Sequence, residues 1–444
     1  MIEKYFQFKE KKTNYKTEIT AGVTTFLSVF YIIFVNPQIL QEANIPYEAA
    51  FAATIFASAI ATLLVGLYAN LPFTLIPGMG INATFTYTAV LGLGFTYQEA
   101  LFGIFVSGCI FFLLSITNIR SMITKTIPNV LKSAVSVGIG FFIAFVGCKN
   151  AGIIIANEST FVTLGDFTKP IIIITILALF SCIICVMKNK PIGVFYTMIA
   201  TIFIILICQF MLNIDLGLKD FVWTPVTELN LSQTLFSCFN VDIIKLFTNM
   251  NFWIIVFSFL FVDFFDTTGM LVTLGKKVNL IQKDGSIKNE KKLMLVDSGS
   301  TIIGSMLGTS SVTTSMESMA GITVGGKTGF SSVITAICFL LSLFIFPIFQ
   351  FLQPVMNAFT TPALVLVGIM MIEHISEIDF TKIKNAAIAF LTIFFTISSY
   401  SIAEGIAIGI ITYVICSLFD KTYKEISPIM YILCIFFFIH YIFM

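Results

Sequence analysis

Long apolar segments separated by short polar connections run through most of the sequence, and they constrain the fold more than any other feature. A helix of about 20 apolar residues crosses the ~30 Å hydrocarbon core of a bilayer. The chain of 444 residues is 57% hydrophobic and only 11% charged. These values predict an all-α polytopic membrane protein. The apolar segments cover approximately residues 18–40, 48–70, 98–118, 128–148, 170–187, 191–212, 251–274, 292–307, 329–351, 361–374, 384–398 and 401–419.

The composition excludes several other classes of protein. A net charge of +1 argues against nucleic-acid binding, which requires a basic surface. The first twenty residues are polar and rich in Lys, so we expect no cleaved signal peptide. The nine Cys residues are scattered, and the close pair Cys182 and Cys185 has no His nearby. We interpret these Cys as small hydrophobic residues, and we expect no metal site and no cofactor.

Two further segments are too irregular for ordinary membrane helices. Residues 71–94 are interrupted by two prolines and by Gly78 and Gly80. Residues 308–326 contain a run of small hydroxyl residues and end in glycines. In each we expect a short extended stretch followed by a half-helix, an arrangement that a bilayer tolerates only around a protein-lined cavity. Counting both segments as crossings gives fourteen.

The basic residues support this count. If the N-terminus lies in the cytoplasm, the loops after even-numbered segments must be cytoplasmic too, and Lys and Arg should gather there. Of the 25 Lys and Arg residues, only Lys149, Lys169, Lys219 and Lys245 fall outside those loops and the N-terminal tail. The pattern predicts a multi-pass protein of the plasma membrane with a cytoplasmic N-terminus.

The two halves of the chain resemble each other. Residues 165–169 (Gly-Asp-Phe-Thr-Lys) before the sixth segment are echoed by residues 378–382 (Ile-Asp-Phe-Thr-Lys) before the thirteenth. Each half has its irregular segment in third place, so these are segments 3 and 10. Seven crossings per half is an odd number, and the second half must therefore be inserted upside down. We expect a 7+7 inverted repeat, in which matched irregular segments mark a transporter binding site.

An acidic pair lies within the apolar run of the eighth segment. Asp263 follows Trp253 by ten residues, and Asp266 precedes Lys276 by ten residues. At about 1.5 Å per helical residue, each acid is about 15 Å from an interfacial residue and so near the bilayer midplane. An ionisable group at this depth is costly and indicates a transport or relay site. The alternative is a packed pair satisfied by neighbouring hydroxyl and backbone groups.

The irregular segments bring two more polar side chains to a comparable depth. Asn82 and Glu317 would each lie in the first turn of a half-helix. Two opposed half-helices direct backbone N–H groups and positive dipole ends at one point. Each residue also has a structural alternative, because Asn82 can cap its helix and Thr314-x-x-Glu317 has the spacing of a capping box.

The deep acids lack basic partners in the sequence. Asp263, Asp266, Asp297, Glu317 and Glu404 lie within or near the segments, and no Lys, Arg or His occupies a comparable depth. Desolvation and mutual repulsion favour the protonated forms of such carboxyls, as coupling to a cation requires. Protons and sodium ions both meet this requirement. Carboxylates with amide and backbone groups suit a neutral, planar ligand rich in N–H donors, and they suit an anion poorly.

Three stretches, residues 77–83 (PGMGINA), 263–269 (DFFDTTG) and 308–318 (GTSSVTTSMES), together resemble the AzgA-like purine permeases. These form the adenine/guanine/hypoxanthine branch of the nucleobase–ascorbate transporter superfamily. Residues 18–26, with the pair Asn36-Pro37, are also similar to that branch, so the resemblance covers essentially the whole chain. It implies a homodimer, proton symport of a purine base, and an elevator-like motion of a core domain against a gate domain.

The resemblance also assigns residues and domains. It implies that Asn82, Asp263 and Glu317 contact the purine and that Asp266 supports binding or proton coupling. We add the neighbouring Gly80 and Met316 to the expected binding residues, and the deep acids Asp297 and Glu404 to those expected to serve proton coupling or support. The expected division is a cytoplasmic tail (1–17), core (18–118 and 251–352), gate (119–212 and 353–420), an extracellular connection (213–250) and a C-terminal apolar segment (421–444), whose run 428–443 is too short to span comfortably.

Two positions depart from the family pattern. Many relatives have Thr where this chain has Met270, and a bulkier β-favouring or aromatic residue where it has Met316. Both flank site residues, so the sequence does not rank adenine, guanine and hypoxanthine. Two alternative functions stay open. A fold-related anion transporter of the sulfate-permease type is disfavoured by the acid-only site. An intramembrane enzyme using Asp263 and Asp266 is disfavoured by the missing basic residues, and we expect no enzymatic activity.

Overall fold

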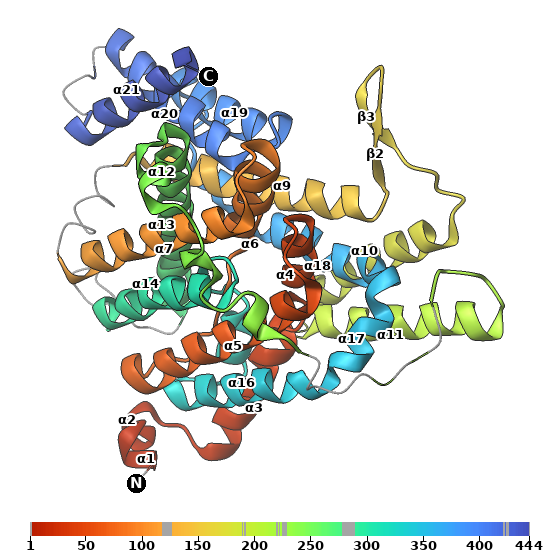
Figure 1. Ribbon diagram of the computed structural model, residues 1–444. Helices are drawn as coiled ribbons and strands as arrows, with labels where there is room; N and C mark the ends of the chain where they lie inside the picture. The colour runs from red at the N-terminus through yellow and green to blue at the C-terminus, as the bar shows by residue number, and fades with distance from the viewer. Residues whose placement is uncertain are drawn as a thin grey trace.

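The computed structural model describes residues 2–117, 127–188, 190, 192–218, 221, 223, 229–277, 289–420, 422 and 426–443. For residues 265, 266, 268–277, 290, 440 and 443 it describes the backbone alone. The described chain is a bundle of helices with two short strand pairs (Figure 1). Asp266 and Met270, both singled out in the sequence, therefore have side chains outside the described part.

The elements of the first half extend to the connection that precedes the acidic pair. They are α1 (Ile2–Tyr5), α2 (Phe8–Lys11), α3 (Tyr15–Val29), α4 (Ile32–Glu42), α5 (Tyr47–Leu64), η1 (Val65–Ala69), β1 (Leu75–Pro77), α6 (Met79–Ala83), η2 (Thr84–Gly92), α7 (Tyr97–Ile116), α9 (Asn129–Asn150), β2 (Ile154–Asn157), β3 (Phe161–Leu164), α10 (Pro170–Met187), α11 (Gly193–Leu206), η3 (Ile207–Met211), η5 (Leu231–Gln233), η6 (Ser237–Phe239) and α12 (Ile243–Thr248).

The second half begins with the helix that carries the acidic pair. Its elements are α13 (Met250–Lys277), α14 (Glu290–Leu307), β4 (Val312–Thr314), α15 (Ser318–Thr323), α16 (Gly329–Ser342), η7 (Leu343–Ile345), α17 (Phe346–Leu352), η8 (Gln353–Val355), α18 (Met356–Met371), η9 (Ile372–Glu377), α19 (Ile383–Ser398), α20 (Ile402–Phe419) and α21 (Pro428–Phe443).

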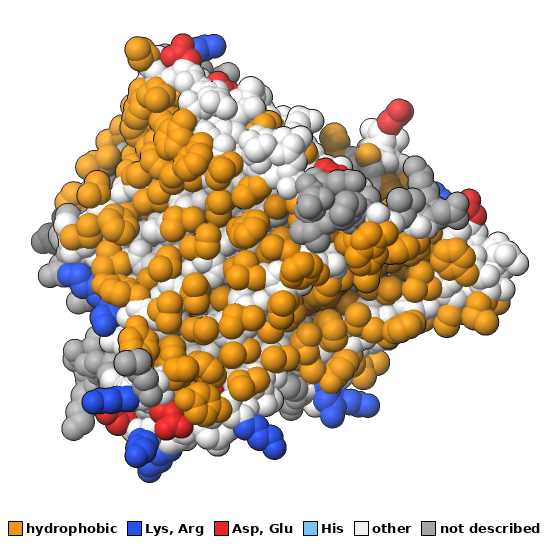
Figure 2. All heavy atoms as spheres, turned by 60° about the horizontal axis from the view of Figure 1, so that its bottom comes forward, with side chains coloured by type: hydrophobic (Ala, Val, Ile, Leu, Met, Phe, Trp, Pro, Cys, Tyr) orange, Lys and Arg blue, Asp and Glu red, His pale blue; other side chains and the backbone are white. Residues whose placement is uncertain are grey.

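The surface and the helices confirm a polytopic membrane protein. Eight helical stretches in the described residues are long and apolar enough to cross a bilayer. Figure 2 shows one face of the molecule covered with hydrophobic side chains, with the charged side chains gathered at its edges. Each of the fourteen segments expected from the sequence coincides with elements of the structure. The number of crossings itself stays a prediction.

The two irregular segments meet in an antiparallel strand pair. Leu75 of β1 lies opposite Thr314 of β4, and Pro77 lies opposite Val312. All residues of both strands are buried. A hydroxyl group binds the backbone of β1 from its other side, as a buried backbone requires: Thr62 Oγ1 accepts the N–H of Leu75 at 3.0 Å and donates to its carbonyl at 3.1 Å. The expectation of extended stretches followed by half-helices is thus confirmed.

Helices from distant parts of the chain pack in two groups. In the first group, α3 and α5 pack against α16, while α7 packs against α13 and α14. In the second group, α9 packs against α18, α19 and α20, and α18 also packs against α10 and α11. The strand pair lies in the first group, where β1 contacts α5 and β4 contacts α13 and α14.

The matching five-residue stretches of the two halves form the same turn. Asp166 accepts hydrogen bonds from the backbone N and the hydroxyl of Thr168 at 2.9 and 2.6 Å. Asp379 accepts the equivalent bonds from Thr381 at 3.2 and 2.5 Å. These bonds lower the pKa of each carboxyl in its exposed loop. The echo in the sequence therefore marks equivalent positions, before α10 and before α19.

Three features differ from the sequence expectations. An exposed hairpin, β2–β3, projects between α9 and α10 (Figure 1). The sequence places no break between Glu317 and Lys327, yet the half-helix α15 ends at Thr323, before Gly325, whose φ of +108° stops a helix. The first segment is two helices, α3 and α4, interrupted at Phe30 and Tyr31, which keep right-handed helical φ and ψ.

Candidate substrate site

A narrow cavity of about 50 Å³ lies beside the paired strands β1 and β4. One wall is the backbone of the two irregular segments, residues 76–80 and 313–317. The opposite wall is apolar and comes from α9 and α18. Its members are Ile139, Ile143, Val367, Met370 and Met371. Helices of both packing groups therefore contribute to this cavity.

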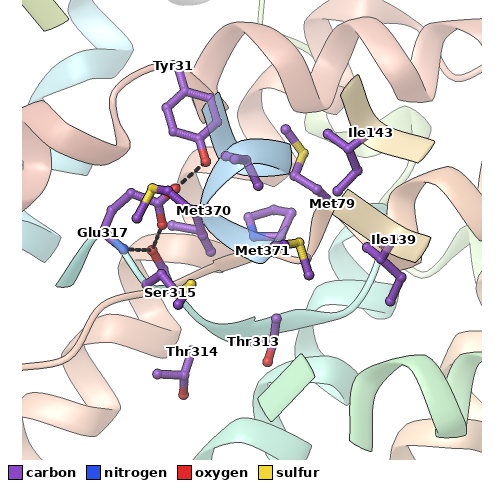
Figure 3. Close-up of a pocket in the computed structure, with 16 residues that line it drawn as sticks. Tyr31, Met79, Ile139, Ile143, Thr313, Thr314, Ser315, Glu317, Met370 and Met371 are labelled. Atoms are coloured by element: carbon purple, nitrogen blue, oxygen red, sulfur yellow. Dashed lines mark hydrogen bonds between the residues drawn. The ribbon is translucent and has the colours of Figure 1, made fainter. Parts of the chain in front are cut away.

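Glu317 is the acidic side chain among the residues that line the cavity. Its Oε1 accepts a hydrogen bond from the Tyr31 hydroxyl at 2.6 Å, and its Oε2 accepts one from the Ser315 hydroxyl (Figure 3). The Ser315 oxygen in turn accepts the backbone N–H of Glu317 at 3.2 Å. Glu317 stands at the N-terminus of α15, so the predicted capping box with Thr314 is not formed. The carboxylate is half-buried and remains accessible from the cavity.

A larger space of about 550 Å³ adjoins the cavity, within the range of ~300–1,000 Å³ common for small-molecule sites. The two spaces share Tyr31, Met316, Glu317, Val367 and Met370 as lining residues. The larger one extends to Lys190 and Gly193, between α10 and α11. Since the sequence places the loop after the sixth segment in the cytoplasm, this vestibule opens toward the predicted cytoplasmic side.

Side chains that follow the first and fifth segments contact each other directly. Asn150 at the end of α9 donates to Glu42 Oε1 at 3.1 Å, and Tyr87 donates to the same oxygen at 3.1 Å. The Lys149 ammonium lies 5.4 Å from the ring centre of Tyr87 and 5.3 Å from that of Tyr400. Cation–π contacts of this kind are attractive. The sequence places the loops after the first and fifth segments on the extracellular side, opposite the predicted cytoplasmic side of the vestibule.

Asp263 and Asp297 lie behind strand β4 and outside the lining of the cavity. Asp263 is 2% exposed and accepts hydrogen bonds from Thr301 at 3.1 Å and Ser311 at 2.9 Å. Asp297 is fully buried and accepts bonds from the Thr267 hydroxyl at 2.7 Å and from the backbone N of Thr314 at 3.2 Å. Both carboxylates therefore hold the strand in place through hydroxyl and backbone donors.

Asn82 is fully buried within α6 and also lies outside the cavity lining. Its Nδ2 donates to Asn36 Oδ1 at 2.6 Å, and its Oδ1 accepts from the Ser310 hydroxyl. Asn36 extends this network by donating to Thr309 at 2.9 Å. The N-cap of α6 is Gly78, so the capping role considered for Asn82 is not the one it has. The amide instead joins the two irregular segments.

Two of the assigned residues line the cavity and another lies elsewhere. Gly80 and Met316 are lining residues. A Cβ at Gly80 would lie 3.2 Å from both Ile139 and Val262, so a larger side chain would crowd this wall. Glu404 lies in the first turn of α20, where it accepts a hydrogen bond from Tyr441 of α21. The structure thus brings Gly80, Met316 and Glu317 together and places Glu404 away from them.

Sequence reasoning missed the residues of the opposite wall and Tyr31. Met370, Met371 and Ile139 are apolar residues of apolar helices, and no local pattern distinguishes them from lipid-facing or core positions. Tyr31 lies at the break between α3 and α4, which an uninterrupted apolar run did not reveal. Within the described residues, no cluster of His, Cys, Asp and Glu could hold a metal ion. The cavity and the space that adjoins it can therefore together bind a flat, largely apolar molecule that offers hydrogen-bond donors to one carboxylate.

Comparisons with known proteins show the family of the chain. A family model described as a permease family matches residues 16–408. A putative permease of Methanocaldococcus jannaschii is 41% identical over all of this chain and 98% of its own. The guanine/hypoxanthine permease PbuG of Bacillus subtilis is 39% identical, with all of both chains covered. The adenine permease AdeP of Escherichia coli is 33% identical over all of this chain and 96% of its own.

Solved structures show the fold. The transmembrane domain of the cyanobacterial bicarbonate transporter BicA has a TM-score of 0.61 at 13% identity, over 88% of this chain and 97% of that one. The murine anion transporter Slc26a9, in its inward-facing state, has a TM-score of 0.58 at 11% identity, over 92% and 69%. The predicted fold class, with its 7+7 repeat, is thereby confirmed.

Proposed function

The chain belongs to the nucleobase–ascorbate permease family, and from this membership we propose that it imports purine nucleobases by secondary active transport. Relatives named as guanine/hypoxanthine and adenine permeases match it along nearly their full lengths. The observation that carries the proposal is the position of Glu317 in a largely apolar cavity beside the paired strands β1 and β4. The substrate is adenine, guanine or hypoxanthine.

The chemistry of the cavity fits a purine. The flat faces of the base would lie against Met370, Met371 and Ile139, where burial of apolar surface contributes about 25 cal/mol per Å². An N–H of the base would donate to the Glu317 carboxylate. A hydrogen bond to a charged acceptor is worth about 1.5–3 kcal/mol, which orients the base and selects against molecules without N–H donors.

We propose that uptake is coupled to protons, as the resemblance to the family implies. Glu317 lines the cavity and is the acid that stands where the base would bind. Asp266 enters the proposal through its family motif, and Asp297 and Glu404 enter it through their depth in the apolar segments. Sodium in place of protons would serve the same physical purpose, and the experiment below separates them.

The remaining family residues would support the site from behind the strands. Asn82 and Asp263 belong to the family motifs, and both bind residues of the 308–318 segment. We propose that they hold the paired strands β1 and β4 in the conformation that directs Glu317 into the cavity. Direct contact of either residue with the base would require the strand β4 or the half-helix α6 to shift, since neither lines the cavity in this structure.

Alternating access fits the arrangement of the interface between the two helix groups. The cavity joins a vestibule on the predicted cytoplasmic side, and the contacts around Glu42 and Lys149 lie on the predicted extracellular side. We propose that the group containing β1 and β4 moves as the core against a gate formed by α9, α10, α11, α18, α19 and α20. A homodimer built on gate helices would hold the gate still while the core moves.

An anion transporter is the second candidate, because the structures of similar fold include bicarbonate and other anion transporters. The cavity argues for the purine. Its described lining contains a carboxylate and no Lys, Arg or His, and a carboxylate repels an anion. Lys190 reaches the vestibule and is exposed, but it does not line the cavity.

The proposed function is tested by uptake in a host strain that lacks its own purine importers. We expect the chain to confer uptake of radiolabelled hypoxanthine that unlabelled adenine or guanine reduces and sulfate or bicarbonate does not. A protonophore at constant sodium should abolish uptake. Uptake of sulfate or bicarbonate with none of a purine would overturn the proposal. Uptake that persists with the protonophore and stops on sodium removal would replace the proton with sodium.

A further inference from the structure

We propose that Tyr31 is a positioning residue of the substrate site, which holds the Glu317 carboxylate toward the bound base. This inference rests on the proposed function and adds a residue that the family motifs do not contain. It is carried by three observations: the place of Tyr31 in the fold, its bond to Glu317, and its position between the cavity and the vestibule.

Tyr31 lies at the interruption between α3 and α4. Val29 ends α3 and Ile32 begins α4, and the two residues between them form a turn with right-handed helical φ and ψ. The Tyr31 side chain is 3% exposed and lines the cavity. Its ring points toward Glu317, the N-cap residue of α15 (Figure 3).

The Tyr31 hydroxyl holds one oxygen of the Glu317 carboxylate. The 2.6 Å bond to Oε1 joins residues 286 positions apart in the chain. The Ser315 hydroxyl holds the other oxygen, Oε2. The two donors come from opposite directions, so the plane of the carboxylate is fixed. Each carboxylate oxygen has two lone pairs, and each can therefore accept a further hydrogen bond from a ligand.

Tyr31 also stands where the cavity meets the vestibule. It shares this boundary with Glu317, Met316, Val367 and Met370, and of these only Tyr31 and Glu317 carry polar side-chain groups. A base that enters from the vestibule would pass the Tyr31–Glu317 pair before reaching the apolar wall. The hydroxyl thus keeps the carboxylate pre-arranged, and pre-arrangement of a binding group increases affinity by lowering its ordering cost.

The test compares Tyr31→Phe with wild type by initial rates of hypoxanthine uptake. Phe keeps the ring and removes only the oxygen. We expect the KM to rise about tenfold, the size of one hydrogen bond to a charged group, with the maximal rate per transporter changed less than about twofold. Tyr47→Phe is the matched control: Tyr47 is equally buried, bonds the sulfur of Met356, and does not line the cavity. Its KM should equal that of wild type.

A double-mutant cycle identifies Glu317 as the group through which Tyr31 acts. Ser315→Ala should also raise the KM, and the double variant should depart from the product of the two single effects, because both hydroxyls hold one carboxylate. Independent, multiplicative effects would overturn the inference. A wild-type KM in Tyr31→Phe, or a lower maximal rate at unchanged KM, would overturn it as well.

Two outcomes separate this inference from the proposed function. If the wild-type protein takes up no purine, the proposed function itself fails. If wild type transports and Tyr31→Phe matches it, only the role of Tyr31 fails. Should Tyr31→Phe not accumulate in the membrane, Tyr31→His restores a ring donor at the position. Its KM should then lie closer to wild type than that of Tyr31→Leu, and equal values would overturn the inference.

Discussion

Strand β4 separates two kinds of acid that look alike in the sequence. In front of it, Glu317 is half-buried, lines a cavity, and is held by the hydroxyls of Tyr31 and Ser315. Behind it, Asp263 and Asp297 are at most 2% exposed and bind hydroxyl and backbone donors of the surrounding segments. All three lie deep in apolar segments, yet only one faces open space.

The difference teaches that depth alone does not make an acid a ligand. A buried carboxylate is tolerated when enough donors surround it, and in that case it stabilises the structure that presents the site. A carboxylate that faces a cavity can still accept a donor from a ligand. Substitution should therefore separate the two kinds of acid. A change at Glu317 should reduce transport without reducing stability, whereas a change at Asp263 or Asp297 should reduce stability.

The largest effect on transport is expected for Glu317→Gln. The amide keeps the size of the side chain but removes the charge that accepts the base N–H, so uptake should fall about a hundredfold. The amount of protein in the membrane and its thermal stability in detergent should match wild type. Normal uptake by this variant would remove the distinction between the two sides of β4.

Asp263→Asn should reduce both purine uptake and the stability of the protein. The carboxylate accepts hydrogen bonds from Thr301 and Ser311 and so supports the 308–318 segment. We expect uptake to fall about tenfold and stability to fall by about 1–2 kcal/mol. Uptake assays and thermal unfolding on the same preparation check this. If Asp263→Asn lost uptake as completely as Glu317→Gln and kept wild-type stability, Asp263 would have to act at the substrate and not as a support of β4.

Asp297→Asn should act mainly on stability. Its carboxylate binds the backbone N of Thr314 and the Thr267 hydroxyl in a fully buried place, and an amide replaces one acceptor with a donor. We expect a loss of about 1–3 kcal/mol, seen as a lower unfolding temperature in detergent. Uptake per folded molecule should stay within about twofold of wild type. Unchanged stability with abolished uptake would contradict the structural role.

The smallest effects on stability and uptake are expected for Asp166 and Asp379, the exposed acids of the two matching turns. Hydrogen bonds from Thr168 and Thr381 lower the pKa of Asp166 and Asp379 below the ordinary 3.8. A lowered pKa means that each turn stabilises the fold above pH 3.8, and that this contribution is lost as the pH falls through the lowered pKa. Unfolding temperatures of Asp379→Ala and wild type should differ slightly at neutral pH and converge in acid. Uptake should be unchanged.

Much of the fold follows from local sequence. Apolar run lengths give the helices, and Pro77 with Gly78 marks the point where the strand β1 ends and the half-helix α6 begins. The hydroxyl-rich stretch before Glu317 predicts the second strand, because its side chains can bind exposed backbone. The pairing of the two strands then follows from the inverted repeat. These features depend on residues close together in the chain, which is why they could be read directly.

The site was only partly predictable. Glu317 could be found because an acid after an irregular segment is rare. Met370 and Ile139 could not be found, because their role depends on which helices pack opposite the paired strands β1 and β4. Asp263 and Glu317 have the same chemistry and comparable depth, so the sequence could not show that a strand lies between them. The role of Tyr31 depends on the interruption between α3 and α4, and the sequence has no Pro or Gly at that point that would predict it.

The most direct test is a structure determined with bound hypoxanthine. We predict density for the base in the cavity beside β1 and β4, with an N–H within hydrogen-bond distance of a Glu317 carboxylate oxygen and its flat face against Met370 or Met371. Asp263 and Asp297 should keep their hydroxyl partners. Density for the base anywhere else in the protein, with Glu317 still bonded only to Tyr31 and Ser315, would contradict the account.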